Sequence, residues 1–182
     1  ESYLVTLSIS LILGFGLCFF GKKSKKRINF IEQLILIISV YLIIGFLISI
    51  PFYLSDFKIT FLSALFESMS GLTGTGFSIF ENIKYLDPTL ILWRSSSQWI
   101  GGLYFLVFLL IIFSNKSFNF KMTSLTYSGE SNIVSEENIK NNLIKIFIFY
   151  SALSILIFFL LSVTGIRLFN SLNLSMSLTS GG

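Results

Sequence analysis

The apolar positions of the chain fall into four long runs separated by short polar segments. The runs cover residues 3–20, 28–50, 89–113 and about 144–164. A helix that crosses a membrane needs roughly 20 mostly apolar residues, so the pattern predicts four membrane-spanning helices. Pro51 is predicted to close the second helix, and Asp87 followed by Pro88 is typical of a helix start.

The connector between the second and third runs contains a shorter apolar segment. Residues 61–72 read FLSALFESMSGL, and a Gly/Thr-rich stretch follows at 73–76. A helix of this length extends about 18 Å, which is too short to cross a bilayer. The segment is also too apolar to be a free loop. We therefore predict a re-entrant element, in which a short helix enters the membrane and the chain returns on the same side.

Composition and charge agree with a multi-pass membrane protein. Charged residues form only 12% of the 182-residue chain, against about 25% in soluble domains, and the mean hydropathy is +0.82. By the positive-inside rule, a basic link between the first two runs is cytoplasmic, the connector is outside, and residues 114–142 form a cytoplasmic loop. A nucleic-acid site would also use basic residues, but their place between two apolar runs favours a membrane anchor. These residues are Lys22, Lys23, Lys25, Lys26 and Arg27.

The segment Thr73-Gly74-Thr75-Gly76 has the chemistry to bind a dehydrated cation. Backbone carbonyls can replace the water of an ion when the chain is held extended toward one axis. The two glycines permit backbone angles that other residues rarely adopt, and the two threonines add hydroxyl groups. The C-terminal end of the preceding helix carries about −0.5 elementary charge, which favours a nearby cation. We therefore predict a cation selectivity filter of backbone carbonyls at Thr73, Gly74, Thr75 and Gly76, with no cofactor.

The order of a long apolar run, a short apolar segment and a Gly-containing stretch begins again after the fourth run. Ser68-Met69-Ser70 matches Ser175-Met176-Ser177 at an offset of 107. Leu72-Thr73 and Gly76 match Leu178-Thr179 and Gly182 at an offset of 106, which implies that one residue is missing from the second copy. Repeats at the same topological place indicate one unit used several times. The match predicts a short helix at about 168–178 and a second filter segment formed by Thr179, Ser180, Gly181 and Gly182.

These residues resemble the Trk/Ktr/HKT superfamily of potassium transporters, and most closely its TrkH branch. The resemblance runs through residues 64–76, ALFESMSGLTGTG, and continues in residues 93–102, WRSSSQWIGG. It implies an all-α integral membrane protein with four helix–pore helix–helix repeats, whose re-entrant filter loops surround one pore. About one and a half of the four repeats would be present here. Gly76 and Gly182 would be the key filter glycines.

The resemblance also implies a division of the chain. Residues 1–27 would hold the last helix of an N-terminal hairpin and the basic link. Residues 28–113 would form the first pore repeat, with helix 28–50, pore helix 61–72, filter 73–76 and helix 89–113. Residues 143–182 would form the first half of the second repeat. The implied function is potassium uptake across the inner (plasma) membrane by a lipid-embedded homodimer, with a cytosolic nucleotide-binding regulatory subunit of the TrkA or KtrA type.

An intramembrane enzyme and a non-conducting accessory subunit are the alternatives to transport. Intramembrane enzymes also use re-entrant segments, but they need a nucleophile with a base, or a metal site. The chain has no histidine, so a serine–histidine pair and an HExxH zinc site are both excluded within these residues. The chain is therefore predicted not to be an enzyme. A non-conducting accessory membrane subunit remains open as an alternative.

Several polar or small residues near the predicted filter have two possible roles. Glu67 either tunes the passage of cations or bonds the filter backbone, and the second is favoured because a buried carboxylate must be paired. Arg94 either partners carbonyls of the filter or pore helix, or extends to the membrane interface. The segment Ser95–Gln98 either bonds the neighbouring pore helix or faces a wet vestibule. Gly101 and Gly102 are expected to permit close helix packing.

Overall fold

The computed structural model describes residues 2–22, 29–81, 86–114 and 136–182, and within them it contains helices and connecting turns without strands. Most of the basic link and most of the predicted loop at 114–142 lie outside these residues. The six helices in the described part of the chain are, in order, α1 (Ser2–Gly21), α2 (Phe30–Tyr53), α3 (Phe61–Thr73), α4 (Pro88–Ser114), α5 (Glu136–Val163) and α6 (Leu168–Ser180).

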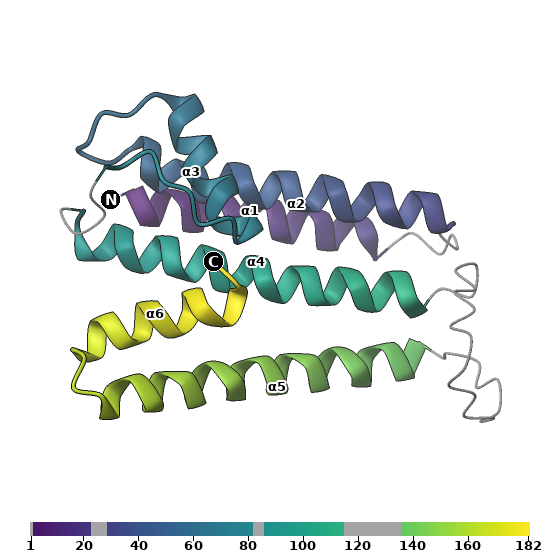
Figure 1. Ribbon diagram of the computed structural model, residues 1–182. Helices are drawn as coiled ribbons and strands as arrows, with labels where there is room; N and C mark the ends of the chain where they lie inside the picture. The colour runs from purple at the N-terminus through teal and green to yellow at the C-terminus, as the bar shows by residue number, and fades with distance from the viewer. Residues whose placement is uncertain (1, 23–28, 82–85, 115–135) are drawn as a thin grey trace.

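Four of these helices are long and apolar enough to cross a membrane. They are α1, α2, α4 up to Ile112 and α5 from Lys140, which confirms the four predicted spans. Figure 1 shows the long helices running alongside one another, with the two short helices α3 and α6 occupying the same half of the bundle. Both short helices end close to the middle of α4.

Two predicted helix bounds differ most from the structure. Helix α2 continues through Pro51 to Tyr53, because a proline removes only one backbone donor and the N–H of Leu54 still reaches the carbonyl of Ile50 at 2.9 Å. Helix α5 begins at Glu136, inside the range predicted as loop and ahead of the predicted boundary at 143. Hydropathy marks the apolar run, whereas a helix can extend beyond that run into water.

Helix α4 is the element on which both short helices pack. It contacts α3 and α6, and also α2 and α5. A methyl group at Gly101 would overlap the backbone carbonyl of Leu72 at the end of α3. One at Gly102 would come within 3.0 Å of the Cα of Ser180 at the end of α6. The expected role of these two glycines in close packing is confirmed, and they determine how near the two short helices come to α4.

Polar side chains also attach α4 to the spans on either side. The hydroxyl of Tyr104 donates to the backbone carbonyl of Ile37 on α2, at 2.7 Å. The indole N–H of Trp99 donates to the hydroxyl of Ser154 on α5, at 2.8 Å. Hydrogen bonds of this kind between membrane helices contribute on average about 0.6 kcal/mol each. They hold α4 in register with its neighbours at the level where the short helices end.

The contact at Gly101 predicts a strong response to a single methyl group. Gly101→Ala is expected to lower the thermal unfolding midpoint of the full-length protein in detergent, because α3 must move away from α4; such overpacking costs about 1–3 kcal/mol. The control is Gly14→Ala on α1, where an added methyl meets nothing within 4 Å. The control should be neutral or slightly stabilising. Equal midpoints for the two variants would contradict the assigned contact.

Candidate functional site

The two short helices end in the same left-handed glycine turn. Gly74 after α3 has a φ of 68°, and Gly181 after α6 has a φ of 84°. In each case the glycine N–H donates to the carbonyls three and four residues earlier. The next N–H donates to the carbonyl five residues earlier, at 3.2 Å for Thr75 and 3.1 Å for Gly182. Glycine is favoured at such a position because it adopts left-handed angles without steric cost.

These caps align the two copies at an offset of 107 with no gap. Gly181 corresponds to Gly74, and Gly182 corresponds to Thr75. The caps thus align the ends of the two helices without a gap, whereas the contacts between the turns join Gly74 to Ser180 and Gly76 to Gly182, at the offset of 106. The missing residue in the second copy and the pairing of Gly182 with Gly76 stay predictions.

The two turns lie against each other. A methyl group built on Gly74 would lie 3.2 Å from the carbonyl oxygen of Ser180, and one built on Gly182 would lie 3.4 Å from the carbonyl oxygen of Gly74. A methyl group on Gly76 would lie 3.7 Å from the carbonyl carbon of Gly182. The structure thus brings residues of both predicted filter segments together. Thr73 is the last residue of α3, one residue beyond the predicted end of that helix.

Hydroxyl groups support the first turn. The buried Ser70 donates to the carbonyl oxygen of Phe77 at 2.6 Å, which joins α3 to the chain beyond the turn. Thr73 donates to the carbonyl of Met69 at 2.8 Å, and its hydroxyl oxygen lies 2.9 Å from that of Thr75. The side chains of the two threonines are exposed, so the turn presents hydroxyl groups at its surface.

A buried ion pair lies behind the first turn. The Nε of Arg94 is 2.7 Å from a carboxylate oxygen of Glu67, whose side chain is fully buried. The carboxylate also accepts from the hydroxyl of Ser78 at 3.0 Å and from the backbone N–H of Ile79 at 2.9 Å. The Nη2 of Arg94 donates to the carbonyl of Gly76 at 2.9 Å. The pair therefore connects α3, α4 and the segment that follows the turn.

These contacts decide between the two roles given for each charged residue. Glu67 is held by Arg94, Ser78 and the backbone N–H of Ile79, so its role is structural, but its backbone partner lies beyond the predicted filter and not within it. Arg94 partners a carbonyl of the predicted filter and does not extend to the interface. The Gly76 carbonyl is consequently directed toward α4.

Helix α4 is also bonded directly to α6. The hydroxyl of Ser95 donates to the side-chain oxygen of Asn173 at 2.7 Å, so of the two roles given for the segment Ser95–Gln98, Ser95 has the bond to a neighbouring short helix. Sequence reasoning missed Asn173 and also Tyr150, whose hydroxyl donates to the carbonyl of Trp99 at 3.0 Å. A polar amide in an apolar membrane segment requires a partner, and that was the signal available for Asn173.

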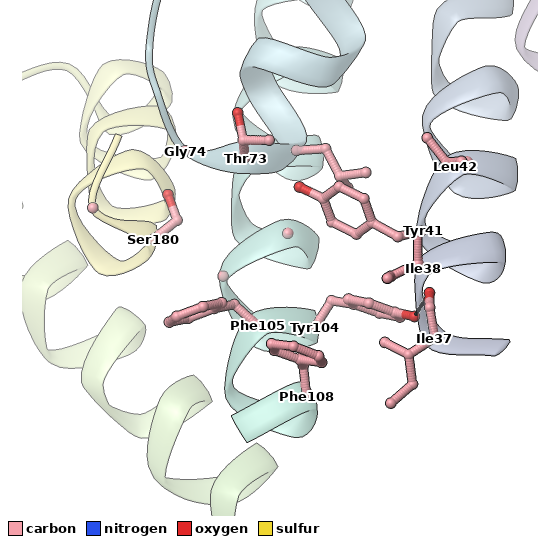
Figure 2. A pocket seen from close by; sticks show the side chains of 14 residues that line it. Ile37, Ile38, Tyr41, Leu42, Thr73, Gly74, Tyr104, Phe105, Phe108 and Ser180 are labelled. Atoms are coloured by element: carbon pink, nitrogen blue, oxygen red, sulfur yellow. Dashed lines mark hydrogen bonds between the residues drawn. The ribbon is translucent and has the colours of Figure 1, made fainter. Parts of the chain in front are cut away.

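A cavity of about 480 Å³ adjoins both turns. Its roof includes Thr73, Gly74, Ser180 and Gly181, and its walls come from α2 and the second half of α4, as Figure 2 shows. No group of three or more His, Cys, Asp or Glu side chains in the described part of the chain could hold a metal ion. The first turn carries backbone carbonyl groups and the hydroxyl groups of Thr73 and Thr75.

Comparison with known families covers nearly the whole chain. The family described as TrkH, cation transport protein, matches residues 2–182. The chain belongs to the TrkH family. This confirms the branch indicated by the resemblance. Because the family consists of transport proteins, it also confirms that the chain is not an enzyme, and together with the four spans it makes the chain part of a multi-pass membrane protein.

Three relatives illustrate the similarity. An uncharacterized cation transporter of Methanocaldococcus jannaschii is 31% identical over 78% of this chain and 30% of its own length. The Trk system potassium uptake proteins TrkG and TrkH of Escherichia coli are 28% and 27% identical over 56% and 59% of this chain. Those matches cover 21% and 22% of the two proteins. The chain thus spans less than a third of the length of these relatives.

The ion pair predicts a strong dependence of stability on both partners. Removing one partner of a buried pair typically costs about 3–5 kcal/mol, because the other charge stays buried without compensation. Arg94→Gln and Glu67→Gln should each lower the thermal unfolding midpoint of the full-length protein. The loss of stability in the double variant should be smaller than the sum of the losses in the two single variants, since no charge is then left unpaired.

The matched control is Arg167→Gln at the exposed start of α6, which should change the midpoint little. If the loss of stability in the double variant equals the sum of the losses in the two single variants, the side chains of Glu67 and Arg94 do not act as a pair.

Proposed function

We propose that the chain forms part of a potassium uptake protein and that the two glycine turns are strands of its selectivity filter. The observation that carries the proposal is the meeting of two short helices that end in the same cap, with the Gly74 turn against the Ser180 and Gly182 backbone. In this proposal α3 and α6 are pore helices of successive repeats. A cation that leaves water would be coordinated by carbonyl oxygens of the two turns.

Electrostatics favours a cation at this place. Each short helix directs its C-terminal end, which carries about −0.5 elementary charge, toward the turns. The turns add uncharged oxygen ligands, which suit a monovalent ion that must bind and leave again. The names of the Escherichia coli relatives, potassium uptake proteins, support potassium as the ion.

The contacts suggest different tasks for the predicted filter residues. In the first strand, Thr73, Gly74 and Thr75 would present oxygen atoms to the ion. Gly76 would supply a left-handed backbone angle, with a φ of 74°, while its carbonyl is held by Arg94. In the second strand, residues 179–182 would have the equivalent place, with Gly182 as its key glycine.

The resemblance supports the remaining parts of the proposal. We propose four such repeats around one pore in the inner membrane, of which residues 28–113 form the first and residues 143–182 begin the second. Residues 1–27 would then belong to an N-terminal hairpin. A homodimer and a cytosolic nucleotide-binding subunit of the TrkA or KtrA type are proposed on the same basis.

The proposal predicts that Gly76→Ser alters ion selectivity. A serine at this left-handed position strains the backbone by roughly 1–2 kcal/mol and should displace the strand against Gly182. Rubidium and sodium uptake by the full-length protein in cells that lack other potassium uptake systems should show a reduced ratio of rubidium to sodium. Gly165→Ser is the matched control, because Gly165 has a φ of 83° and nothing within 4 Å of an added methyl.

The control carries similar backbone strain in the turn between α5 and α6, so it should retain the selectivity of the unchanged protein. Unchanged selectivity and rate in Gly76→Ser would contradict the filter assignment. Absence of any uptake by the unchanged full-length protein would favour the accessory-subunit alternative.

A further inference from the structure

The cavity beside the glycine turns has walls rich in aromatic rings. Tyr41 and Tyr104 form one pair with ring centroids 5.4 Å apart, and Phe105 and Phe108 form another at 6.4 Å. Figure 2 shows Tyr41 below Thr73 and Gly74 and Tyr104 reaching from α4 toward α2, with Phe108 beside α4 and Phe105 on the side of α4 away from α2. The cavity volume of about 480 Å³ falls within the range of roughly 300–1,000 Å³ that is usual for small-molecule sites.

The roof of the cavity is electronegative. Thr73 and Ser180 are the last residues of α3 and α6, so two helix C-terminal ends meet the cavity there. Each end carries about −0.5 elementary charge on carbonyl groups that have no partner within the helix. Among the described residues no aspartate or glutamate lines the cavity, and the groups there with negative character are backbone carbonyls and the faces of aromatic rings.

Carbonyl dipoles above aromatic walls match one class of ligand. A small inorganic cation keeps its water unless oxygen atoms surround it, and here the walls are mostly carbon. A quaternary ammonium ion has little hydration to lose and is attracted by ring faces, as in aromatic cages. We propose that this cavity binds a quaternary ammonium ion below the filter. The expectation that the bound ion blocks transport rests on the proposed function.

The position of the cavity along the helices sets the side of access. Ile37, which also lines the cavity, lies in the first half of α2, which follows the basic link, and Phe108 lies in the second half of α4. By the positive-inside rule both belong to the cytoplasmic half of the membrane. The ligand therefore arrives from the cytoplasm and stops at the roof.

Tyr41 is the residue that best tests this site. The hydroxyl of Tyr104 is already bonded to the Ile37 carbonyl, so changing Tyr104 would also loosen α4 from α2. The hydroxyl of Tyr41 has no hydrogen-bond partner among the described residues, and Figure 2 shows it pointing toward the space under Thr73 and Gly74. Changes at Tyr41 thus alter the cavity while leaving the bond between α2 and α4 in place.

The experiment uses the full-length protein reconstituted in liposomes. Tetrabutylammonium applied to the cytoplasmic face should block rubidium flux, and the same concentration outside should not. Tyr41→Leu should weaken the block about three- to tenfold because it removes a ring face, whereas Tyr41→Phe should retain the block. Tyr53→Leu is the matched control, because Tyr53 is at the other end of α2 and does not line the cavity.

Calorimetric titration of tetrabutylammonium into the purified protein separates the two proposals. Binding that Tyr41→Leu weakens supports the site, even if rubidium flux is absent, in which case the proposed transport function fails alone. Rubidium flux without tetrabutylammonium binding overturns the proposed site. This is the result expected if another segment of the full protein fills the cavity. Binding that is unchanged in Tyr41→Leu also overturns it.

Discussion

Backbone that leaves a helix at membrane depth must find its hydrogen-bond partners within the protein, because lipid offers none. The two glycine turns lie against the middle of α4, a helix long and apolar enough to cross a membrane, and polar side chains around them bond their backbone. In the first turn, Ser70 bonds the carbonyl of Phe77 and Arg94 bonds that of Gly76. In the second, the hydroxyl of Ser177 donates to the carbonyl of Gly182 at 2.9 Å. Hydroxyl and guanidinium groups thus supply the hydrogen bonds that water would supply to the backbone of a soluble loop.

The two turns meet this requirement by unequal means. At the offset of 107, the position of Glu67 is taken by Leu174, so α6 carries no carboxylate at that place. The first turn is held by a buried ion pair, which ties three segments together but leaves a costly charge if either partner is lost. The second short helix is held to α4 by the neutral bond between Ser95 and Asn173. One helix, α4, carries both kinds of support on its surface.

Much of this arrangement was predictable from the sequence, because the lengths of apolar runs reflect bilayer thickness. The four spans and the first short helix follow from that constraint, and the glycines of α4 were correctly assigned to close packing. The bounds at Pro51 and Glu136 were missed, since hydropathy reports membrane depth and not where helical hydrogen bonding stops. The contact of Gly101 with the Leu72 carbonyl and the bond to Asn173 depend on helix rotation, which apolar runs spanning the whole helix surface do not specify.

The double use of the Ser95 hydroxyl bears on how the chain enters the membrane. Synthesis proceeds from the N-terminus, so α4 is made before α6 and must wait for it. During that interval Asn173 is absent, yet the Ser95 hydroxyl also lies 2.8 Å from the carbonyl of Ile91, one turn earlier in its own helix. A serine can therefore be inserted with its hydrogen already shared inside the helix and can later turn to a neighbour without passing through an unbonded state. Asn173 is added last, because α6 is synthesised after α4. Its side-chain oxygen then accepts from the Ser95 hydroxyl, which is already in place.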